Sequence, residues 1–240
     1  MIESYVVFDL ETTGINPSTD SIIEIGAIKI IKNEVKETFK TYVNPEIKIP
    51  ERIKELTGIT DKMVSGGMAN KEAVSKFIEF SEDYILLGHN IGFDYGFVKK
   101  SAKNYNISFE KEGLDTLKIA RAALAHLESK SLGALCSHYE IEQKTAHRAY
   151  EDAFVTKCLY DKLRYEFYNE KKHLFEPTEL IFKEKKESLI TKIQKGYLND
   201  LLKYHKIELE ADINQLTKSE ASKRIDYIIL NYGRIRGGRR

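Results

Sequence analysis

The sequence has few of the features that mark secreted, membrane-spanning or disulfide-stabilised proteins. Its only two cysteines, Cys136 and Cys158, lie in apolar segments without a CxxC or histidine-rich context, so we expect neither a disulfide nor a zinc site. No apolar run approaches the roughly 20 residues of a membrane-spanning helix, and the N-terminus lacks the basic and apolar stretches of a signal peptide. These absences predict a cytoplasmic protein with reduced core thiols and no membrane contact.

Proline is also scarce, and its distribution predicts a domain boundary. Of the four prolines only Pro177 follows Pro50, and the strongly charged stretch 183–187 comes soon after it. We therefore expect a main domain over residues 1–172, a linker at 173–187 and a small helical C-terminal module at 188–240. A module of about 50 residues would be only marginally stable by itself.

The net charge of +1 hides an uneven distribution along the chain. Residues 188–240 contain 11 Lys and Arg against 6 Asp and Glu, a surplus of +5, which leaves −4 for residues 1–187. An acidic body with a basic tail fits a metal site combined with a segment that holds a polyanion. Ordinary scatter of surface charge explains the same numbers. Charge alone favours this second interpretation over a polyanion-binding segment.

The apolar periodicity predicts an α/β layer fold with a mixed sheet. Strand-like runs alternate with segments of helical spacing in the main domain. We expect strands at 4–10, 22–31, 35–43 and 84–87, a hairpin turn at 32–34, helices at 71–80, 92–104, 131–139 and 149–172, and two C-terminal helices at 189–205 and 218–230.

Two acidic residues belong to the first strand-like run. Because side chains alternate along a strand, Asp9 and Glu11 project to the same side, roughly 7 Å apart. Carboxylates on one face repel each other unless a cation lies between them, and hard oxygen ligands suit Mg²⁺ or Mn²⁺. An exposed strand end with two ordinary acids is the alternative, and this motif alone leaves both interpretations open.

Two further segments place an acid near the start of a helix. Asp94 falls in the first turn of one helix, where the helix dipole favours a carboxylate, and there it could be a simple stabiliser with Asn90 as the N-cap. His147 and Asp152 are five residues apart, about 140° on a helix, so they can share a site only if His147 lies on the loop before the helix. An exposed histidine beside carboxylates can accept a proton from a metal-bound water, although a lone histidine is usually a plain surface residue.

The segments FDLETTG (8–14), GHNIGFD (88–94) and HRAYEDA (147–153) together resemble the three motifs of the DEDDh exonucleases. This family contains the proofreading subunit of bacterial DNA polymerase III and ribonuclease T. The resemblance covers residues 4–165, and LTGIT (56–60) and LDTL (114–117) resemble two further recurrent stretches. The four acids and the histidine of the family match Asp9, Glu11, Asp94, Asp152 and His147.

The resemblance implies a ribonuclease H-like fold, a five-stranded mixed sheet flanked by helices. It also implies a 3′–5′ exonuclease that uses two divalent ions, Mg²⁺ or Mn²⁺, and releases nucleoside 5′-monophosphates. Asp9 would bridge both ions, Glu11 and Asp152 would hold the ion carrying the attacking water, Asp94 would hold the other ion, and His147 would be the general base. The substrate-binding residues would be Thr12, Thr13, Ile59, Asn90 and Phe93.

The expected partners are single-stranded 3′ ends of nucleic acid, DNA more than RNA, and a DNA polymerase in replication proofreading or repair. An exoribonuclease, an endonuclease and a non-catalytic nucleic-acid-binding module on the same fold are the alternatives. For residues 188–240 two hypotheses stand level. Either the basic residues, including Arg234, Arg236, Arg239 and Arg240, grip the phosphate backbone, or the module is a docking or stabilising extension.

Overall fold

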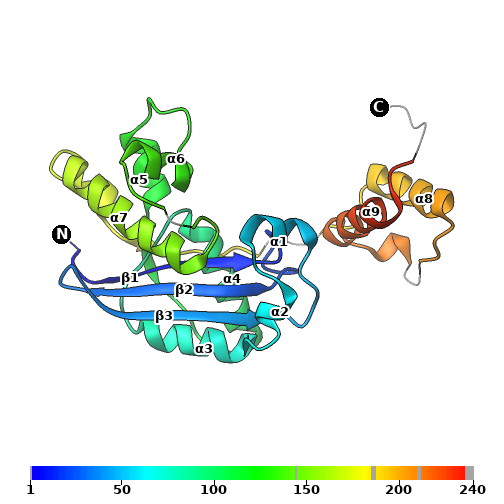
Figure 1. Ribbon diagram of the computed structural model, residues 1–240, viewed down its shortest axis with the longest axis horizontal. Helices are drawn as coiled ribbons and strands as arrows, with labels where there is room; N and C mark the ends of the chain where they lie inside the picture. The colour runs from blue at the N-terminus through cyan, green and yellow to red at the C-terminus, as the bar shows by residue number, and fades with distance from the viewer. Residues whose placement is uncertain (1, 144, 185–187, 210–211, 236–240) are drawn as a thin grey trace. The chain divides into compact units, whose positions relative to one another are not determined.

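The computed structural model describes residues 2–143, 145–184, 188–209 and 212–235 (Figure 1). The chain forms two compact units, one ending at Phe182 and one beginning at Lys183. The strands of the first unit are β1 (Tyr5–Thr12), β2 (Ile22–Ile31), β3 (Glu34–Asn44), β4 (Met68–Ala69), β5 (Leu86–Gly88), β6 (Glu112–Asp115) and β7 (Thr178–Glu179). Its helices are α1 (Glu51–Thr57), α2 (Asp61–Val64), α3 (Asn70–Ser81), α4 (Ile91–Asn104), α5 (Thr116–Ala123), α6 (Leu132–His138), α7 (Ala149–Phe167) and the 3₁₀ turn η1 (Lys172–Phe175).

The strands form one mixed sheet in the order β4-β3-β2-β1-β5-β6-β7. The long strands β1, β2 and β3 are antiparallel neighbours, whereas β5 runs parallel to β1 and β6 runs parallel to β5. The predicted mixed α/β fold is confirmed. The expected number of five strands is exceeded because β4 and β7 add two residues each at the two edges.

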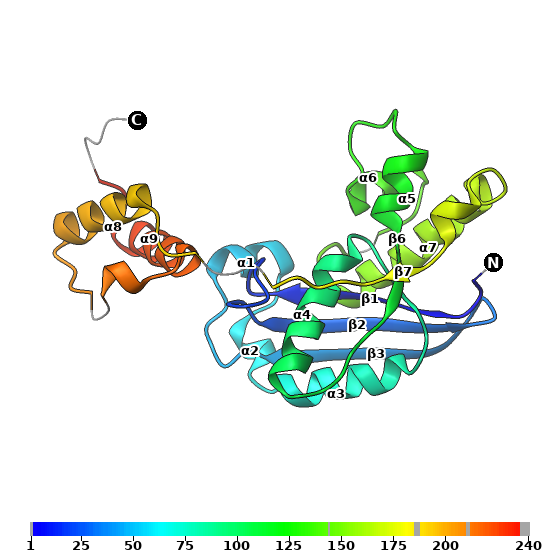
Figure 2. The same cartoon turned by 180° about the vertical axis from the view of Figure 1, so that it is seen from behind.

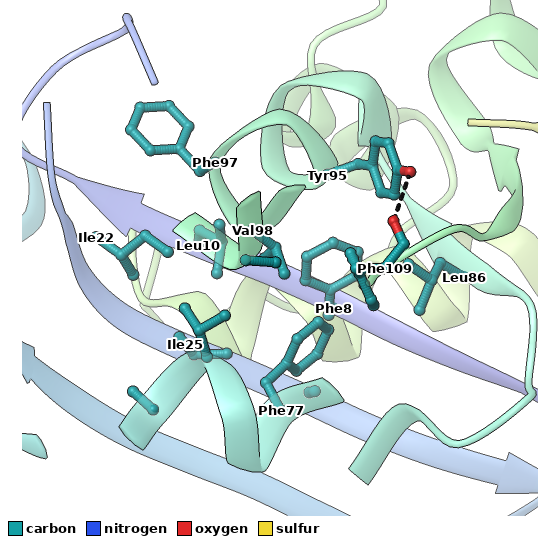
Figure 3. Packing of buried hydrophobic residues seen from close by; sticks show 14 of the residues in the cluster. Phe8, Leu10, Ile22, Ile25, Phe77, Leu86, Tyr95, Phe97, Val98 and Phe109 are labelled. Atoms are coloured by element: carbon teal, nitrogen blue, oxygen red, sulfur yellow. Dashed lines mark hydrogen bonds between the residues drawn. The ribbon is translucent and has the colours of Figure 1, made fainter. Parts of the chain in front are cut away.

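Helices cover both faces of the sheet (Figures 1 and 2). On β1 the side chains of Val6, Phe8 and Leu10 pack with α3 and α4, while those of Tyr5 and Val7 pack with α5, α6 and α7. This alternation is the period of two expected for a strand buried on both sides. Figure 3 shows the first of these cores, where Phe8 packs on Phe77 with ring centroids 4.8 Å apart.

The hairpin between β2 and β3 turns where the sequence predicts it. Lys32 and Asn33 both have a left-handed backbone, with φ of 52° and 65°, as a two-residue hairpin turn requires. The short helices α1, α2 and α5 are absent from the sequence prediction. α1 and α2 contain seven and four residues, too few to display an apolar period.

The segment expected to be a linker begins inside the first unit. Phe175 and Leu180 are buried, β7 pairs with β6, and the backbone N–H of Leu180 donates to Lys111 O at 2.8 Å. These apolar and sheet contacts hold the chain to the first unit as far as Phe182, about ten residues beyond the expected boundary. The rest of the expected linker includes 185–187, which lie outside the described residues.

The second unit is a helical pair with a core of its own. It contains α8 (Lys192–His205), the 3₁₀ turn η2 (Ile213–Gln215) and α9 (Lys218–Tyr232). Thr191 and Thr217 each cap a helix through a capping box, which fixes where α8 and α9 begin. Its buried core residues are Leu198, Leu201, Leu216, Ile225 and Ile228. Among the described residues of the whole chain, no helix is long and apolar enough to cross a membrane.

Candidate active site

One face of β1 and β2 changes from apolar to acidic along the strands. On β1, Asp9 and Glu11 continue the face that begins with Tyr5 and Val7, which pack beneath α7. On β2, Glu24 pairs directly with Glu11 in the antiparallel register. Glu11 and Glu24 are 9% and 7% exposed, so the carboxyl groups lie at the border of the core rather than in open solvent.

Asp94 reaches the same place from the other side of β1. β5 pairs with β1 only at Val6 and Val7, which leaves the later edge of β1 free for another partner. The backbone N–H of Leu10 donates to Asp94 Oδ1 at 3.1 Å. Asp94 is 4% exposed and lies in the first turn of α4, as the sequence predicts. This bond places the Asp94 carboxyl beside the strand segment that carries Asp9 and Glu11.

His147 and Asp152 meet at the beginning of α7. His147 lies on the preceding loop with a left-handed backbone, φ 59°, and Asp152 lies within the helix. The backbone N–H of His147 donates to Asp152 Oδ2 at 3.0 Å, and Gln143 Nε2 donates to Oδ1 at 2.8 Å. The loop-and-helix arrangement that the spacing requires is therefore the one observed.

Sequence reasoning missed Glu24, Gln143 and Gly26, three residues that hold this helix start in place. Glu24 accepts hydrogen bonds from Arg148 and from the backbone N–H of Ala149. A Cβ on Gly26 would lie 2.1 Å from Tyr150 N, so only glycine lets the helix approach β2 this closely. The signal for Glu24 and Gly26 was present in the sequence as an acid and a glycine inside the run 22–31, whose only other polar residue is Lys29.

The four matched acids interact strongly. Burial raises the pKa of Asp9 well above its usual value, and the carboxyls of Asp94 and Asp152 raise it further. Burial raises the pKa of Glu11 to about 8, and the neighbouring Asp152 adds to the rise. The pKa of Asp94 is also raised to about 8 by burial, against the opposing effect of the Leu10 N–H. Such a set of carboxyls is costly to ionise together without a cation.

The donor set fits divalent cations. One ligand atom each from Glu11, His147 and Asp152 lies within 4.8 Å of the others, close enough to surround one ion. Asp9 and Asp94 add carboxylate oxygens that are electrostatically coupled to this group. Mg²⁺ and Mn²⁺ prefer hard oxygen ligands, and carboxylates outnumber cationic side chains in this group.

The expected substrate-binding residues lie in three parts of the first unit, between α1 and α2, at the end of β1 and at the start of α4. The prediction that Ile59 contacts the substrate is not supported, because its side chain is 0% exposed and packs against Ile23, Ile49 and Val64 in a separate core. Tertiary contacts from three other segments bury it, and these are invisible in the local pattern LTGIT. Leu56, in the same segment, is 51% exposed.

Thr12 and Thr13 shape the loop that follows β1. Thr12 Oγ1 donates to Gly14 O at 2.6 Å, and Thr13 Oγ1 accepts the N–H of Ser21 at 2.9 Å. Both are buried, so their hydroxyls fix the loop backbone next to Glu11.

Asn90 and Phe93 lie at the beginning of α4. Asn90 is exposed with a left-handed backbone, φ 66°, and its N–H donates to Asp115 Oδ1 at 2.9 Å. The same oxygen accepts the N–H of Leu117, which ties the recurrent stretch 114–117 to the second motif. Phe93 is half-buried and its ring packs on Phe97, with centroids 5.1 Å apart.

Comparison with known proteins gives matches for about the first two thirds of the chain. The family model described as exonuclease, RNase_T, matches residues 6–160. The chain is 36% identical over 161 residues to the DNA polymerase III subunit epsilon of Aquifex aeolicus, covering 67% of this chain and 80% of that protein. It is 40% identical over 159 residues to the PolC-type DNA polymerase III of Caldanaerobacter subterraneus subsp. tengcongensis, covering 66% of this chain but only 11% of that much longer protein.

Solved structures agree on the fold. The nuclease domain of 3′hExo, a DEDDh family member bound to rAMP, superposes with a TM-score of 0.60 at 18% identity, covering 75% of this chain and 98% of that one. At this identity the likeness establishes the architecture only.

Proposed function

Because this chain belongs to the exonuclease family whose model matches residues 6–160, we propose that it removes nucleotides one at a time from the 3′ end of a nucleic acid. The products would be nucleoside 5′-monophosphates, released by divalent-metal-dependent hydrolysis of the phosphodiester bond. The observation that carries this proposal is the meeting of Asp9, Glu11, Asp94 and Asp152 with His147 at one end of β1.

The four carboxylates would hold two cations, Mg²⁺ or Mn²⁺. Bound there, the cations would supply activation of the attacking water and stabilisation of the leaving oxygen. The protein's own contribution is to hold the carboxyl groups in fixed positions. Asp94 is fixed by the Leu10 N–H, and Asp152 is fixed by Gln143 and by the backbone of His147. Little reorganisation is then needed when the substrate arrives.

His147 would act as the general base. Its imidazole is exposed, so it can receive a proton from the attacking water at a ring nitrogen and return it to solvent. Its ring offers a nitrogen within 4.8 Å of carboxylate oxygens of Glu11 and Asp152, where a reacting water can be shared between them.

DNA is the substrate we propose first, because the matched relatives are named as parts of DNA polymerase III. For the same reason we propose that the chain serves proofreading or repair, with a polymerase as its partner. An exoribonuclease on this fold is the alternative, because one structural neighbour is bound to rAMP, a ribonucleotide.

The second unit would hold the nucleic-acid strand. At about 100° per residue, Lys192, Lys195 and Lys203 fall on one side of α8, within about 80° of each other, and Lys206 caps the same helix. Lys192, Lys203 and Lys206 are exposed. A row of cations beside a polyanion substrate is the arrangement that binds phosphates without sequence preference. Of the four C-terminal arginines, Arg234 is described, whereas 236, 239 and 240 lie outside the described residues.

The deciding experiment is release of mononucleotides from a 3′-labelled oligonucleotide in Mg²⁺, with Asp9→Ala and His147→Ala as variants. We expect Asp9→Ala to be inactive and His147→Ala to lose about 10²–10⁴-fold in kcat with little change in affinity. Binding without any release by the unaltered protein would support the non-catalytic module. Cleavage of a substrate with both ends blocked would support an endonuclease. A panel of single-stranded, duplex and mismatched DNA against RNA then settles the substrate.

A further inference from the structure

Glu24 adds a fifth carboxyl to a site that is already crowded with negative charge. It is 7% exposed and faces Glu11 across the β1–β2 pair. Its charge raises the pKa of Asp9, Glu11 and Asp152, so it makes the acid cluster harder to ionise. A buried charge with this cost requires a compensating partner.

That partner is the start of α7. Arg148 Nη2 lies 2.8 Å from Glu24 Oε1, and Arg148 Nε donates to Oε2 at 3.2 Å, a two-point ion pair. The backbone N–H of Ala149, the first residue of α7, donates to the same Oε2 at 3.1 Å. Arg148 occupies the N-cap position without capping the helix by its own side chain, so Glu24 supplies the cap from the neighbouring strand.

Tyr42 also contacts the guanidinium of Arg148. Its hydroxyl lies 2.7 Å from Arg148 Nη2, and the guanidinium carbon lies 5.6 Å from the centre of its ring. β2 and β3 therefore both hold the Arg148 side chain, which has little freedom to turn elsewhere.

His147 lies between two anchors. On one side its backbone N–H is bound by Asp152, and on the other side the next two residues are bound by Glu24. Its left-handed backbone, φ 59°, is uncommon for a residue other than glycine, and the hydrogen bonds on both sides hold the loop in this conformation. We propose that Glu24, acting through Arg148 and the first N–H of α7, is a positioning residue that holds His147 toward the acid cluster.

This inference rests on the proposed role of His147 as general base. Its first test compares Glu24→Ala with Glu24→Gln in the full chain at saturating Mg²⁺. Displacement of a catalytic group by about 1 Å costs on the order of 100-fold, so we expect Glu24→Ala to lower kcat by about that factor with KM within about twofold. The amide oxygen of the glutamine variant can still accept the Ala149 N–H, so Glu24→Gln should lose less.

The matched control is Glu37→Ala. Glu37 also pairs with a cation on the same sheet, since its Oε2 lies 3.2 Å from Lys29 Nζ, but it faces away from the site on β3. The kcat of the Glu37→Ala variant should therefore equal that of the unaltered protein. If Glu24→Ala does not fold, Arg148→Lys takes its place, because lysine keeps the charge but cannot make the two-point pair, and it should lower kcat in the same way.

A double variant separates this inference from the proposed function. If Glu24 acts through His147, then Glu24→Ala should cause no further loss of kcat in a His147→Ala background. An equal loss in both backgrounds, or a raised Mg²⁺ requirement in Glu24→Ala alone, would show that Glu24 acts on the cations and would overturn the inference. Full activity of His147→Ala alone would instead overturn the general-base role.

A measurement without substrate or metal gives the second readout. Hydrogen exchange of the amides of 147–152 in the metal-free protein should quicken in Glu24→Ala and remain unchanged in Glu37→Ala, because only the former releases the loop and the helix start. Unchanged exchange in Glu24→Ala would also overturn the inference.

Discussion

The backbone N–H of Leu10 donates to Asp94 Oδ1 at 3.1 Å, across 84 residues of sequence. Leu10 stands between Asp9 and Glu11, so this one bond joins the first acidic motif to the second. It also satisfies a buried donor at the edge of β1 beyond the reach of β5, which pairs only with Val6 and Val7. Asp94 thus has a structural role beside its proposed role as a cation ligand, and the two can be separated.

Asp94→Asn separates them, because the amide oxygen can still accept the Leu10 N–H while the charge is lost. We expect kcat to fall by about 100-fold or more, since a proposed cation ligand is removed. The melting temperature of the metal-free protein should rise, because the variant removes one of several mutually repelling carboxyls. Thermal melting and single-turnover kinetics test both expectations. An active Asn variant would remove Asp94 from the cation site.

The metal-free protein should lose stability as the pH rises from about 4.5 to 8. The folded-state pKa values of Glu11 and Asp94 are about 8, well above their ordinary values, so in this range the folded state binds more protons than the unfolded state. Stability then falls with rising pH. Mg²⁺ or Mn²⁺ should restore it, and more strongly at pH 8 than at pH 5, where the ion must displace protons.

Thermal melting curves across this pH range, with and without Mg²⁺, measure the effect. The matched control is the double variant Glu11→Gln with Asp94→Asn, in which both the slope with pH and the Mg²⁺ response should be much reduced. A melting temperature of the unaltered protein that does not change with pH would contradict the coupling between these carboxyls.

Local pattern was sufficient to predict the elements that carry the proposed site residues. The alternation in β1 placed Asp9 and Glu11 on one face, and the five-residue spacing required His147 to lie on a loop before the helix of Asp152. These inferences succeeded because each depends on backbone geometry within one element.

Contacts between distant segments were beyond that reasoning. Ile59 was expected at the substrate, but its burial depends on three residues from other segments. Glu24 was passed over because its role exists only once β2 meets the start of α7. The two-residue strand β7 is defined by its pairing with β6 and has no pattern of its own.

Gly26→Ala should damage both stability and activity. The added Cβ would lie 2.1 Å from Tyr150 N and 2.3 Å from Ala149 C, and these backbone atoms cannot move aside without shifting the start of α7. We expect a loss of about 1–3 kcal/mol in the free energy of unfolding and a lower kcat, as Asp152 moves from the acid cluster. Gly66→Ala is the control, since a Cβ there meets nothing within 4 Å. Equal stability of the two variants in urea unfolding would contradict this account of the close approach.

The exposed lysines of the second unit should contribute to strand binding in proportion to their charge. Changing Lys192, Lys203 and Lys206 to Gln leaves the core of Leu198 and Leu201 untouched, so the unit should remain folded. Each lost phosphate contact lowers the salt dependence of single-strand affinity by about 0.7, so the slope of log K against log salt should become shallower by about 2. Fluorescence anisotropy with a labelled single strand, at several salt concentrations, measures it. The charge-matched control changes three exposed lysines of the first unit, Lys36, Lys76 and Lys172. If both triple variants keep the original slope, the second unit is a docking or stabilising extension.

If the slope becomes equally shallow in both triple variants, the effect belongs to total charge rather than to this face of α8.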